Sequence, residues 1–282
     1  MNGFDPAEGR HEGAWIEIER VTRRFAGRAV KGRTGDGGVA AVQDVSLRIG
    51  RGESIALVGT SGSGKSTLAR IMAGLDRPTS GLVRYAGNVV DPESRKWQTR
   101  RHRMQMIFQD PAAALNPRHR AGDILAEVAE HGRGGRGVRS SVRDIDAMLT
   151  GVGLSPADRE KFPHEFSGGQ KQRLSLARAL AAEPDTILAD EPLSALDVSV
   201  QAQILVLLNA LREERSLTLV FVTHDLAVVP HIAQRIAVMA NGMIVEDGPV
   251  DEVFGKPRHE ATKSLLKAAR RGSTGGPKTG IV

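Results

Sequence analysis

One glycine-rich run, from Gly59 to Thr67, constrains this chain of 282 residues more than any other feature. The run follows Ser54 to Val58, an apolar stretch of strand length. It precedes Leu68 to Ala73, where apolar residues recur at helical spacing until Gly74 can cap the helix. A strand, a glycine-rich loop and a helix in this order predict a loop that wraps around a phosphate group.

The predicted loop carries the groups that a nucleoside triphosphate with Mg²⁺ requires. Its glycines let backbone N–H groups turn inward, and the helix N-terminus adds partial positive charge. Lys65 would reach the outer phosphates, and Ser66 would offer a hydroxyl to Mg²⁺. A glycine-rich turn with a solvated lysine is the alternative, but it leaves the flanking strand and helix unexplained. The residues expected to bind the ligand are Gly59, Ser61, Gly62, Ser63, Gly64, Lys65, Ser66 and Thr67.

Composition limits the other chemistries open to the chain. There is no cysteine, which excludes disulfides and thiolate-held zinc or clusters, so any metal is expected to be held by oxygen. A net charge of +6 could indicate nucleic acid or an anionic membrane, but 26% charged residues of both signs is typical of a solvated exterior. Seven Phe, two Trp and one Tyr provide no aromatic platform for stacking bases, so nucleic acid is not an expected partner.

The composition predicts a globular protein, because 40% of the residues are apolar and can fill a core. No apolar run is long enough to cross a bilayer, because the best candidate, 217–239, is interrupted by polar residues. The N-terminus does not resemble a signal peptide. We expect a loose leader at 1–14, one domain at 15–270 and a disordered tail at 271–282.

Several strands and helices can be placed by their periodicity. An antiparallel pair is expected from 16–19 and 43–49, joined through a glycine-rich loop at 31–38. The pattern changes at about 112–183 to an inserted helical subdomain, whose Gly/Arg run at 132–137 is expected to be a loop rather than an RNA-binding segment. The other expected elements are strands at 82–85, 104–108, 186–189 and 217–222, helices at 95–103, 121–131, 142–151 and 200–211, and a hairpin of 235–240 with 243–246 around Asn241-Gly242.

Polar residues follow three of the predicted strands, where α/β proteins place functional groups. Gln109 follows the strand at 104–108, and Asp190-Glu191 follow the strand at 186–189. One of these two carboxylates could hold Mg²⁺ while the other takes a proton from water, although a surface acidic pair is the alternative. His224 follows 217–222, where it could hydrogen-bond a γ-phosphate or its attacking water rather than serve as an ordinary core or surface histidine.

Two further features could contact a nucleotide. Ser167, Gly168, Gly169 and Gln170 precede a strong helical pattern, which makes a second helix N-terminus able to bind an anion. Phe25, at the end of the first strand, could either pack at the sheet edge or stack on a purine.

Together these residues resemble the ATP-binding cassette (ABC) ATPases, over roughly Trp15 to Ala269. Phe166 to Gln170 is similar to the family signature, whose usual leading residue is Leu, and Ser194 to Asp197 resembles its D-loop. The resemblance implies that ATP and Mg²⁺ are bound and that a dimer encloses the nucleotide. It makes Gln109 the Q-loop glutamine at the metal, Asp190 the magnesium-side carboxylate, Glu191 the general base, His224 the switch histidine, Phe25 the adenine-stacking residue, and Lys65 and Asp197 nucleotide contacts.

Within the family, Phe108 to Arg118 and Ala189 to Leu205 resemble the ATPase subunits of oligopeptide, dipeptide and nickel importers. The chain departs from that branch at His259 to Lys263, where a His-Pro-Tyr segment is often found, and it lacks the cysteine cluster of some relatives. The resemblance implies two transmembrane permease subunits, an identical or paralogous ATPase partner and an extracytoplasmic solute-binding protein. It also implies a peripheral location at the cytoplasmic face of the membrane.

The expected fold is therefore an α/β, P-loop (RecA-like) core with an antiparallel β-subdomain and an inserted α-helical subdomain. The expected function is ATP hydrolysis that drives uptake of peptides or nickel through separate membrane subunits. One alternative is a soluble ABC ATPase of a nucleic-acid or metabolic complex such as phosphonate breakdown. Such proteins usually have paired cassettes or long coiled-coil insertions, which this chain lacks. A binding module without turnover is the other alternative, and the presence of Glu191 and His224 argues against it.

Overall fold

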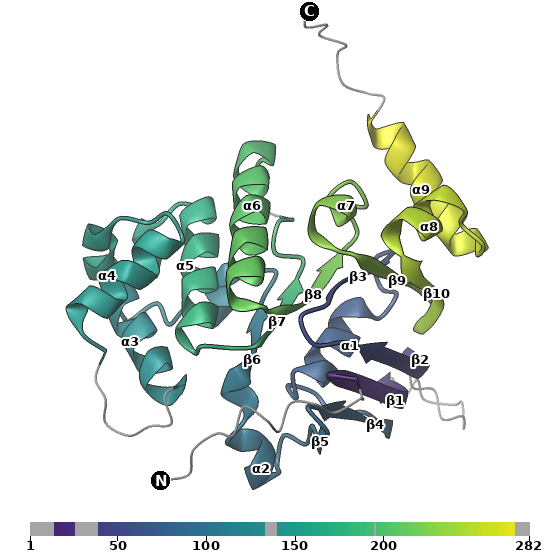
Figure 1. The fold of residues 1–282 in the computed structure, drawn as a ribbon, viewed down its shortest axis with the longest axis horizontal. Coiled ribbons are helices and arrows are strands. Elements are labelled where there is room, and N and C mark those ends of the chain that lie inside the picture. The colour runs from purple at the N-terminus through teal and green to yellow at the C-terminus, as the bar shows by residue number, and fades with distance from the viewer. Residues whose placement is uncertain (1–13, 26–38, 133–139, 195, 274–282) are drawn as a thin grey trace, which may run out of the picture.

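The computed structural model describes residues 14–25, 39–132, 140–194 and 196–273, whose strands form two sheets (Figure 1). The predicted loop at 31–38, nearly all of the Gly/Arg run, Ala195, residues 1–13 and residues 274–282 lie outside the described residues. The larger sheet consists, from edge to edge, of β10 (Met243–Pro249), β9 (Arg235–Ala240), β3 (Ser54–Gly59), β8 (Thr218–Thr223), β7 (Thr186–Asp190) and β6 (Met104–Ile107).

The larger sheet is parallel except at one edge. β3 pairs in parallel with β8 and β9, and β7 pairs in parallel with β8 and β6, whereas β10 is antiparallel to β9. Every residue of β3, β7 and β8 is buried, as expected for strands covered on both faces. The strands predicted from apolar runs and the hairpin around Asn241-Gly242 are therefore confirmed.

The smaller sheet is antiparallel and has the order β2 (Val39–Ile49), β1 (Ile16–Phe25), β4 (Ser80–Tyr85) and β5 (Asn88–Val89). The predicted pairing of β1 with β2 is confirmed, with Ile16 opposite Ile49 and Ile18 opposite Leu47. Both strands run further than predicted, so that Phe25 pairs with Val39. The register of the β1–β2 pairing shifts after Ile18, where Arg20 and Asp44 adopt positive φ angles of 48° and 47°. Beyond this irregularity the two strands pair again as far as Phe25.

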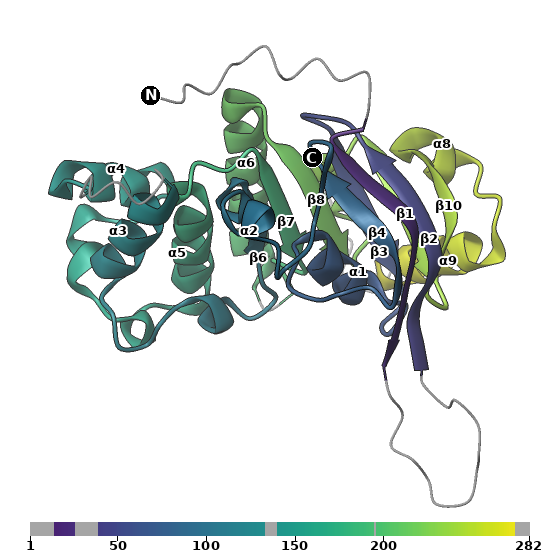
Figure 2. The same ribbon diagram turned by 90° about the horizontal axis from the view of Figure 1, so that it is seen from below.

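Helix α1 (Lys65–Met72) lies between the two sheets (Figure 2). It contacts β1 and β2 of the smaller sheet and β3, β7 and β8 of the larger one. Leu68, Ile71 and Met72 are fully buried in the cluster that joins the sheets. This packing holds the N-terminus of α1 at the carboxyl end of β3.

The region between β6 and β7 contains helices and no strand among its described residues. Leu125, Leu149 and Leu174 are among the residues that form its core, and this core continues onto the larger sheet through Ile187 and Phe221. The helices gather on one side of the larger sheet together with the helix that follows β7 (Figures 1 and 2). They are α3 (Ala121–Gly132), α4 (Val142–Gly151), α5 (Gly168–Ala181) and α6 (Val198–Arg215), with 3₁₀ turns at Pro111–Ala114, Pro156–Glu160 and Pro163–Glu165.

The single helix predicted over 95–103 is wrong. The structure has a short helix α2 (Arg95–Gln98), capped by Ser94, and then a separate 3₁₀ turn at Arg101–Arg103. Trp97 is the buried residue of α2, and no residue of the 3₁₀ turn is buried. Most of the stability of a helix in a protein comes from packing its apolar face against other elements. This basic segment has too little apolar surface to hold a longer helix against the core.

Three C-terminal helices are absent from the sequence-based prediction: α7 (Val229–Ile232), α8 (Val250–Gly255) and α9 (Glu260–Ser273). Val229, Val250, Val253 and Leu266 pack in one cluster against the larger sheet. The N-terminus of α9 is held by Glu246, whose carboxylate accepts hydrogen bonds from the backbone N–H groups of Arg258 and His259 at 2.8 and 3.0 Å. The last residues of α9, to Ser273, fall in the stretch expected to be disordered.

Candidate functional site

The glycine-rich run forms the turn between β3 and α1. β3 ends at Gly59 and α1 begins at Lys65. Gly64 adopts a φ of 102°, and a Cβ atom added there would come within 2.1 Å of the Ala41 carbonyl oxygen. Only glycine fits at a position with this backbone angle and this close neighbour. The strand, loop and helix predicted from sequence are confirmed, and the turn places the N-terminus of α1 at the edge of the sheet.

Lys65 is buried against the loop that precedes it. Its Nζ atom donates to the carbonyl oxygens of Gly59 and Thr60, both at 2.9 Å, and the residue is 4% exposed. Burial lowers the pKa of the ammonium group, while the charges of Glu191 and Asp190 act in the opposite direction. An ammonium group has three donors, so one remains for an anionic ligand at the loop.

Ser66 and Asp190 meet at the carboxyl end of β7. Ser66 Oγ donates to Asp190 Oδ1 at 2.9 Å, and Asp190 is 7% exposed. Burial raises the pKa of Asp190, and the hydrogen bond from Ser66 opposes that shift. A buried carboxylate beside a hydroxyl provides the hard oxygen ligands that Mg²⁺ prefers, so these residues fit the metal.

A second observation fits a phosphate ligand at the same loop. The hydroxyl oxygen of Ser63 is buried and has no hydrogen-bond partner, and Ser63 is 3% exposed. Most buried polar groups have a partner, so an unpartnered hydroxyl in this loop suits a bound oxyanion.

Glu191, His224 and Gln109 form a cluster beside Asp190. His224 Nδ1 lies 3.2 Å from Glu191 Oε1, and Gln109 Nε2 donates to Glu191 Oε2 at 3.4 Å. Glu191 has a positive φ of 46°, and its backbone N–H donates to the Val222 carbonyl oxygen at 2.9 Å. A non-glycine residue in this conformation is uncommon and clusters at functional sites. The carboxylate of Glu191 therefore lies between a histidine and an amide.

The strand order explains why residues so far apart in sequence meet. β6, β7, β8 and β3 are neighbours that run parallel, so their carboxyl ends share one edge of the sheet. Gln109 follows β6, Asp190 ends β7, His224 follows β8 and the glycine-rich loop follows β3. The structure brings these predicted residues together.

The residues from Ser167 to Gln170 form a different site at the start of α5. Ser167 accepts a hydrogen bond from the Gln170 backbone N–H at 3.3 Å, and the Gln170 side chain accepts one from the Ser167 N–H at 3.0 Å. A Cβ atom on Gly169 would come within 2.8 Å of Val200 Cγ1, so α5 begins against α6. Asp197 caps α6 by accepting from the Val200 N–H at 3.0 Å.

These two helix starts are not joined to the glycine-rich loop. No hydrogen bond or ion pair described for residues 167–170 or Asp197 reaches residues 59–67. In both views α5 is separated from α1 (Figures 1 and 2). The signature-like segment at the start of α5 therefore lies beside the start of α6, and neither segment is bonded to the glycine-rich loop of the same chain in the described residues.

Phe25 lies at the last position of β1 and is 43% exposed. The Arg23 guanidinium carbon lies 4.6 Å from the centre of its ring, and Arg23 is paired with Asp76 at 2.8 Å. One ring face is thus covered by a cation. The exposed fraction of the ring is compatible with stacking on a base, but no described contact joins Phe25 to the glycine-rich loop.

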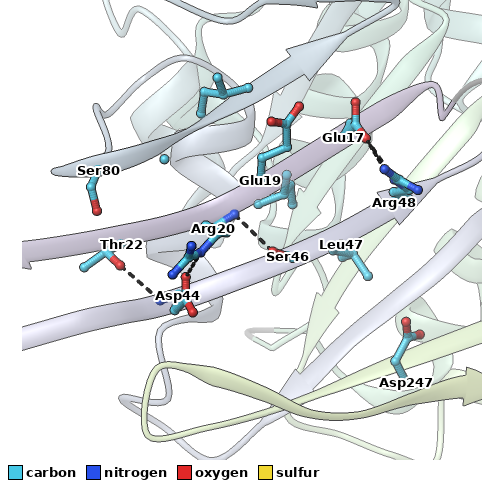
Figure 3. A pocket seen from close by; sticks show the side chains of 13 residues that line it. Glu17, Glu19, Arg20, Thr22, Asp44, Ser46, Leu47, Arg48, Ser80 and Asp247 are labelled. Atoms are coloured by element: carbon cyan, nitrogen blue, oxygen red, sulfur yellow. Dashed lines mark hydrogen bonds and ion pairs between the residues drawn. The ribbon is translucent and has the colours of Figure 1, made fainter.

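A broad hollow of about 1240 Å³ lies elsewhere, over β1, β2 and β4. Figure 3 shows two ion pairs among its side chains, Arg20 with Asp44 at 3.0 Å and Arg48 with Glu17 at 2.8 Å. The other two lining carboxylates, Glu19 and Asp247, pair with arginines outside the lining, Arg84 and Arg235. None of the predicted site residues lines it. Paired charges leave few groups to recognise a ligand, so the candidate site is the strand-end cluster and not this hollow.

One hydrogen-bonded neighbour of the glycine-rich loop was not predicted. The Gly242 N–H of the Asn241-Gly242 hairpin turn donates to the Ser63 carbonyl oxygen, and Gln43 of β2 binds the other side of that turn. The Asn-Gly pair predicts a turn but says nothing of what the turn touches. Only the position of the hairpin at the sheet edge identifies this neighbour.

A parallel sheet with a glycine-rich loop between β3 and α1, and with acidic residues at the end of β7, defines a P-loop nucleoside triphosphatase. Residues 42–194 match the family described as ABC transporter. The chain is 47% identical over 261 residues to a probable peptide ABC transporter ATP-binding protein of Sinorhizobium fredii, which covers 91% of this chain and 72% of that protein. The chain therefore belongs to the ABC transporter family, and it is an ATP-hydrolysing subunit.

Other known proteins agree with this assignment. The oligopeptide transport ATP-binding protein OppF of Bacillus subtilis is 45% identical, over 90% of this chain and 81% of that protein. A dimeric bacterial ABC transporter cassette has a similar solved structure, with a TM-score of 0.72, 31% identity, and coverage of 83% of this chain and 98% of that chain. The expected fold class is thereby confirmed. Within the described residues, no helix combines the length and the apolar character needed to span a membrane.

Proposed function

We propose that this chain couples ATP hydrolysis to peptide import, working at the cytoplasmic face of a membrane with two separate permease subunits. The observation that carries the proposal is the cluster at the carboxyl ends of four neighbouring parallel strands. There, Lys65, the Ser66–Asp190 pair and the Glu191–His224 pair lie around one loop. This grouping contains what phosphoryl transfer needs, which is positioning and charge neutralisation more than covalent help.

Each residue of the cluster has a proposed role. The backbone N–H groups of residues 59–67 and the Lys65 ammonium group bind the phosphates of ATP and neutralise their charge. Ser66 and Asp190, with Gln109, would hold Mg²⁺, which supplies charge stabilisation at the phosphate oxygens when it is bound. Glu191 takes a proton from the attacking water, and His224, 3.2 Å away, orients the Glu191 carboxylate and can hydrogen-bond the γ-phosphate.

We propose that the active form is a dimer, either of identical chains or with a paralogous ATPase. The helix start at Ser167–Gln170 lies on α5, which is separated from α1 in both views, yet this second helix N-terminus favours an anionic ligand. The solved cassette cited above is itself dimeric. In a head-to-tail pair, Ser167 and Gly169 of one chain would complete the phosphate site of the other, and Phe25 would stack on the adenine.

The names of the relatives support peptides as cargo. The Sinorhizobium and Bacillus proteins are a probable peptide transporter subunit and an oligopeptide transport subunit. A protein of Brucella abortus that is 44% identical is named a putative peptide import ATP-binding protein. These names support transport over a soluble nucleic-acid or metabolic complex, and peptides over nickel. A peptide importer would also include an extracytoplasmic solute-binding protein.

Co-purification and uptake together test the proposal. The full chain would be isolated from detergent-solubilised membranes of its source organism, and we expect two membrane-spanning subunits and a solute-binding protein to accompany it. A clean deletion should abolish uptake of di- to oligopeptides, and the wild-type chain should restore it while Glu191→Gln should not. Normal peptide uptake in the deletion strain would contradict the proposed cargo.

A further inference from the structure

The hairpin between β9 and β10 touches the glycine-rich loop at its turn. The Gly242 backbone N–H donates to the Ser63 carbonyl oxygen at 3.1 Å. Ser63 is the buried loop residue with the unpartnered hydroxyl, and it directly precedes Gly64, the N-cap residue of α1. The turn therefore fixes the peptide group that leads directly into the helix N-terminus.

Gln43 of β2 holds this turn from the other side. Its backbone N–H donates to the Gly242 carbonyl oxygen at 2.8 Å, and its side-chain Nε2 donates to the Asn241 carbonyl oxygen at 3.0 Å. Both carbonyl groups of the turn are thus bound by one residue. Gln43 itself has no described hydrogen bond to the loop, so its influence passes through the turn.

The hairpin turn, the start of β2 and the glycine-rich loop are also closely packed against one another. A Cβ atom on Gly242, which has a φ of 79°, would lie 3.0 Å from the Ala41 carbonyl oxygen. That oxygen is also the atom nearest a Cβ placed on Gly64, and Met239 Cε of β9 lies 3.3 Å from the same position. The start of β2, the hairpin turn and the loop therefore meet with little space between them, and β2 and β10 are in contact (Figure 2).

We infer that Gln43 is a positioning residue for the phosphate-binding loop, acting through the Asn241-Gly242 turn. A loop that cradles phosphates with its backbone N–H groups must keep those groups pointing inward before the ligand arrives. The side-chain bond from Gln43 restrains the turn, and the turn restrains the Ser63 peptide group. This inference rests on the proposed role of residues 59–67 in binding ATP.

The consequence is a specific kinetic signature. Without the Gln43 amide, the free loop samples more conformations, and ATP must order it on binding. Affinity falls while the bound complex, now held by the phosphates, reacts at nearly the same rate. Loss of one neutral hydrogen bond corresponds to about a fivefold change in the dissociation constant. A higher KM with an unchanged kcat indicates that the substrate complex and the transition state have lost the same amount of binding energy.

The test uses Gln43→Met, which keeps the size of the side chain and removes its donor. Gln105→Met is the matched control, because Gln105 of β6 is also half-buried and its Nε2 also donates to a backbone carbonyl, that of His102, at 3.0 Å. Equilibrium titration of the purified full-length chains with ATP lacking Mg²⁺ measures affinity without turnover. KM and kcat are then measured with MgATP on the assembled transporter, and melting temperatures are measured on the ATP-free chains.

We expect Gln43→Met to raise the dissociation constant and KM about fivefold, with kcat within about twofold and a melting temperature matching that of Gln105→Met. The control should bind ATP like the wild type. Gln43→Ala should reproduce the result if the Met side chain packs poorly. An unchanged dissociation constant, or an equal loss in both Met variants, would overturn the inference. If the wild-type chain itself binds no ATP, the proposed function fails first and the inference falls with it.

Discussion

His224 Nδ1 lies 3.2 Å from Glu191 Oε1, although the two residues follow different strands of the sheet. The pair exists because β7 and β8 are adjacent and parallel, with Asp190 opposite Val222. Both strands therefore end at the same edge of the sheet. The Glu191 N–H bonded to the Val222 carbonyl oxygen draws the two segments together. A proton acceptor beside a histidine at a phosphate-binding loop is suited to activating water.

The first prediction concerns Glu191. Glu191→Gln should keep ATP binding and lower turnover by roughly 10²–10⁴, because the amide keeps the shape of the side chain but cannot take a proton. Single-turnover hydrolysis and ATP titration measure the two effects separately. Glu214→Gln, an exposed change on α6, serves as the control and should behave like the wild type. Hydrolysis by Glu191→Gln at the wild-type rate would refute the role of general base.

Lys65→Ala should differ from Glu191→Gln in the quantity that it changes. The ammonium group neutralises phosphate charge in the ground state as well as in the transition state, so both affinity and turnover should fall. The dissociation constant for ATP should rise by at least about tenfold, as expected for loss of a charge-assisted contact. Lys96→Ala, an exposed lysine of α2, controls for the loss of one positive charge. Retained ATP affinity in Lys65→Ala would contradict the assignment.

The third prediction tests whether the site is shared between chains. Lys65→Ala and Ser167→Arg should each be inactive alone, and a mixture should recover part of the activity. In a mixed dimer, the Ser167→Arg chain provides an intact loop and the Lys65→Ala chain an intact α5 start, so one sound site reappears. If each chain builds its site alone, mixing restores nothing even though mixed dimers form. With a paralogous partner, the two changes must be placed in different subunits.

A fourth prediction concerns Asp185, at the other end of β7 from the site. Asp185 accepts hydrogen bonds from the Tyr85 hydroxyl and from Arg103 Nε, the latter at 2.9 Å. Burial raises the pKa of Asp185 from 3.8 to about 6. The folded chain therefore holds this proton more tightly than the unfolded chain, so the contribution of Asp185 to stability grows as the pH falls through about 6 and shrinks as the pH rises.

Removing the titration should remove this pH dependence. From about pH 7.5 to about pH 5, the free energy of unfolding of the wild type should gain about 1 kcal/mol relative to that of Asp185→Asn. Urea unfolding at the two pH values measures the difference. Asp251→Asn, an exposed change on α8, should track the wild type at both. A constant gap between wild type and Asp185→Asn would show that the carboxyl does not titrate in this range.

Much of the site could be predicted from sequence because its parts are local. The apolar run before Gly59, the glycines and the helical pattern after Lys65 are neighbours along the chain, and their order alone specifies a phosphate loop. The same holds for the apolar strands near whose carboxyl ends Gln109, Asp190 and His224 lie. Short-range sequence determines strand and helix type there, because continuous burial and helical spacing leave distinct patterns.

The tertiary structure decided which of those parts meet. The order of β6, β7, β8 and β3 depends on pairing between residues more than a hundred positions apart in places, and no local pattern encodes it. The same long-range packing divided the segment at 95–103, extended β1 to Phe25, and set the Asn241-Gly242 turn against Ser63. Local sequence restricts each segment to a few conformations, and contacts between distant segments select among them because burial and hydrogen bonding are satisfied only when the whole sheet is assembled.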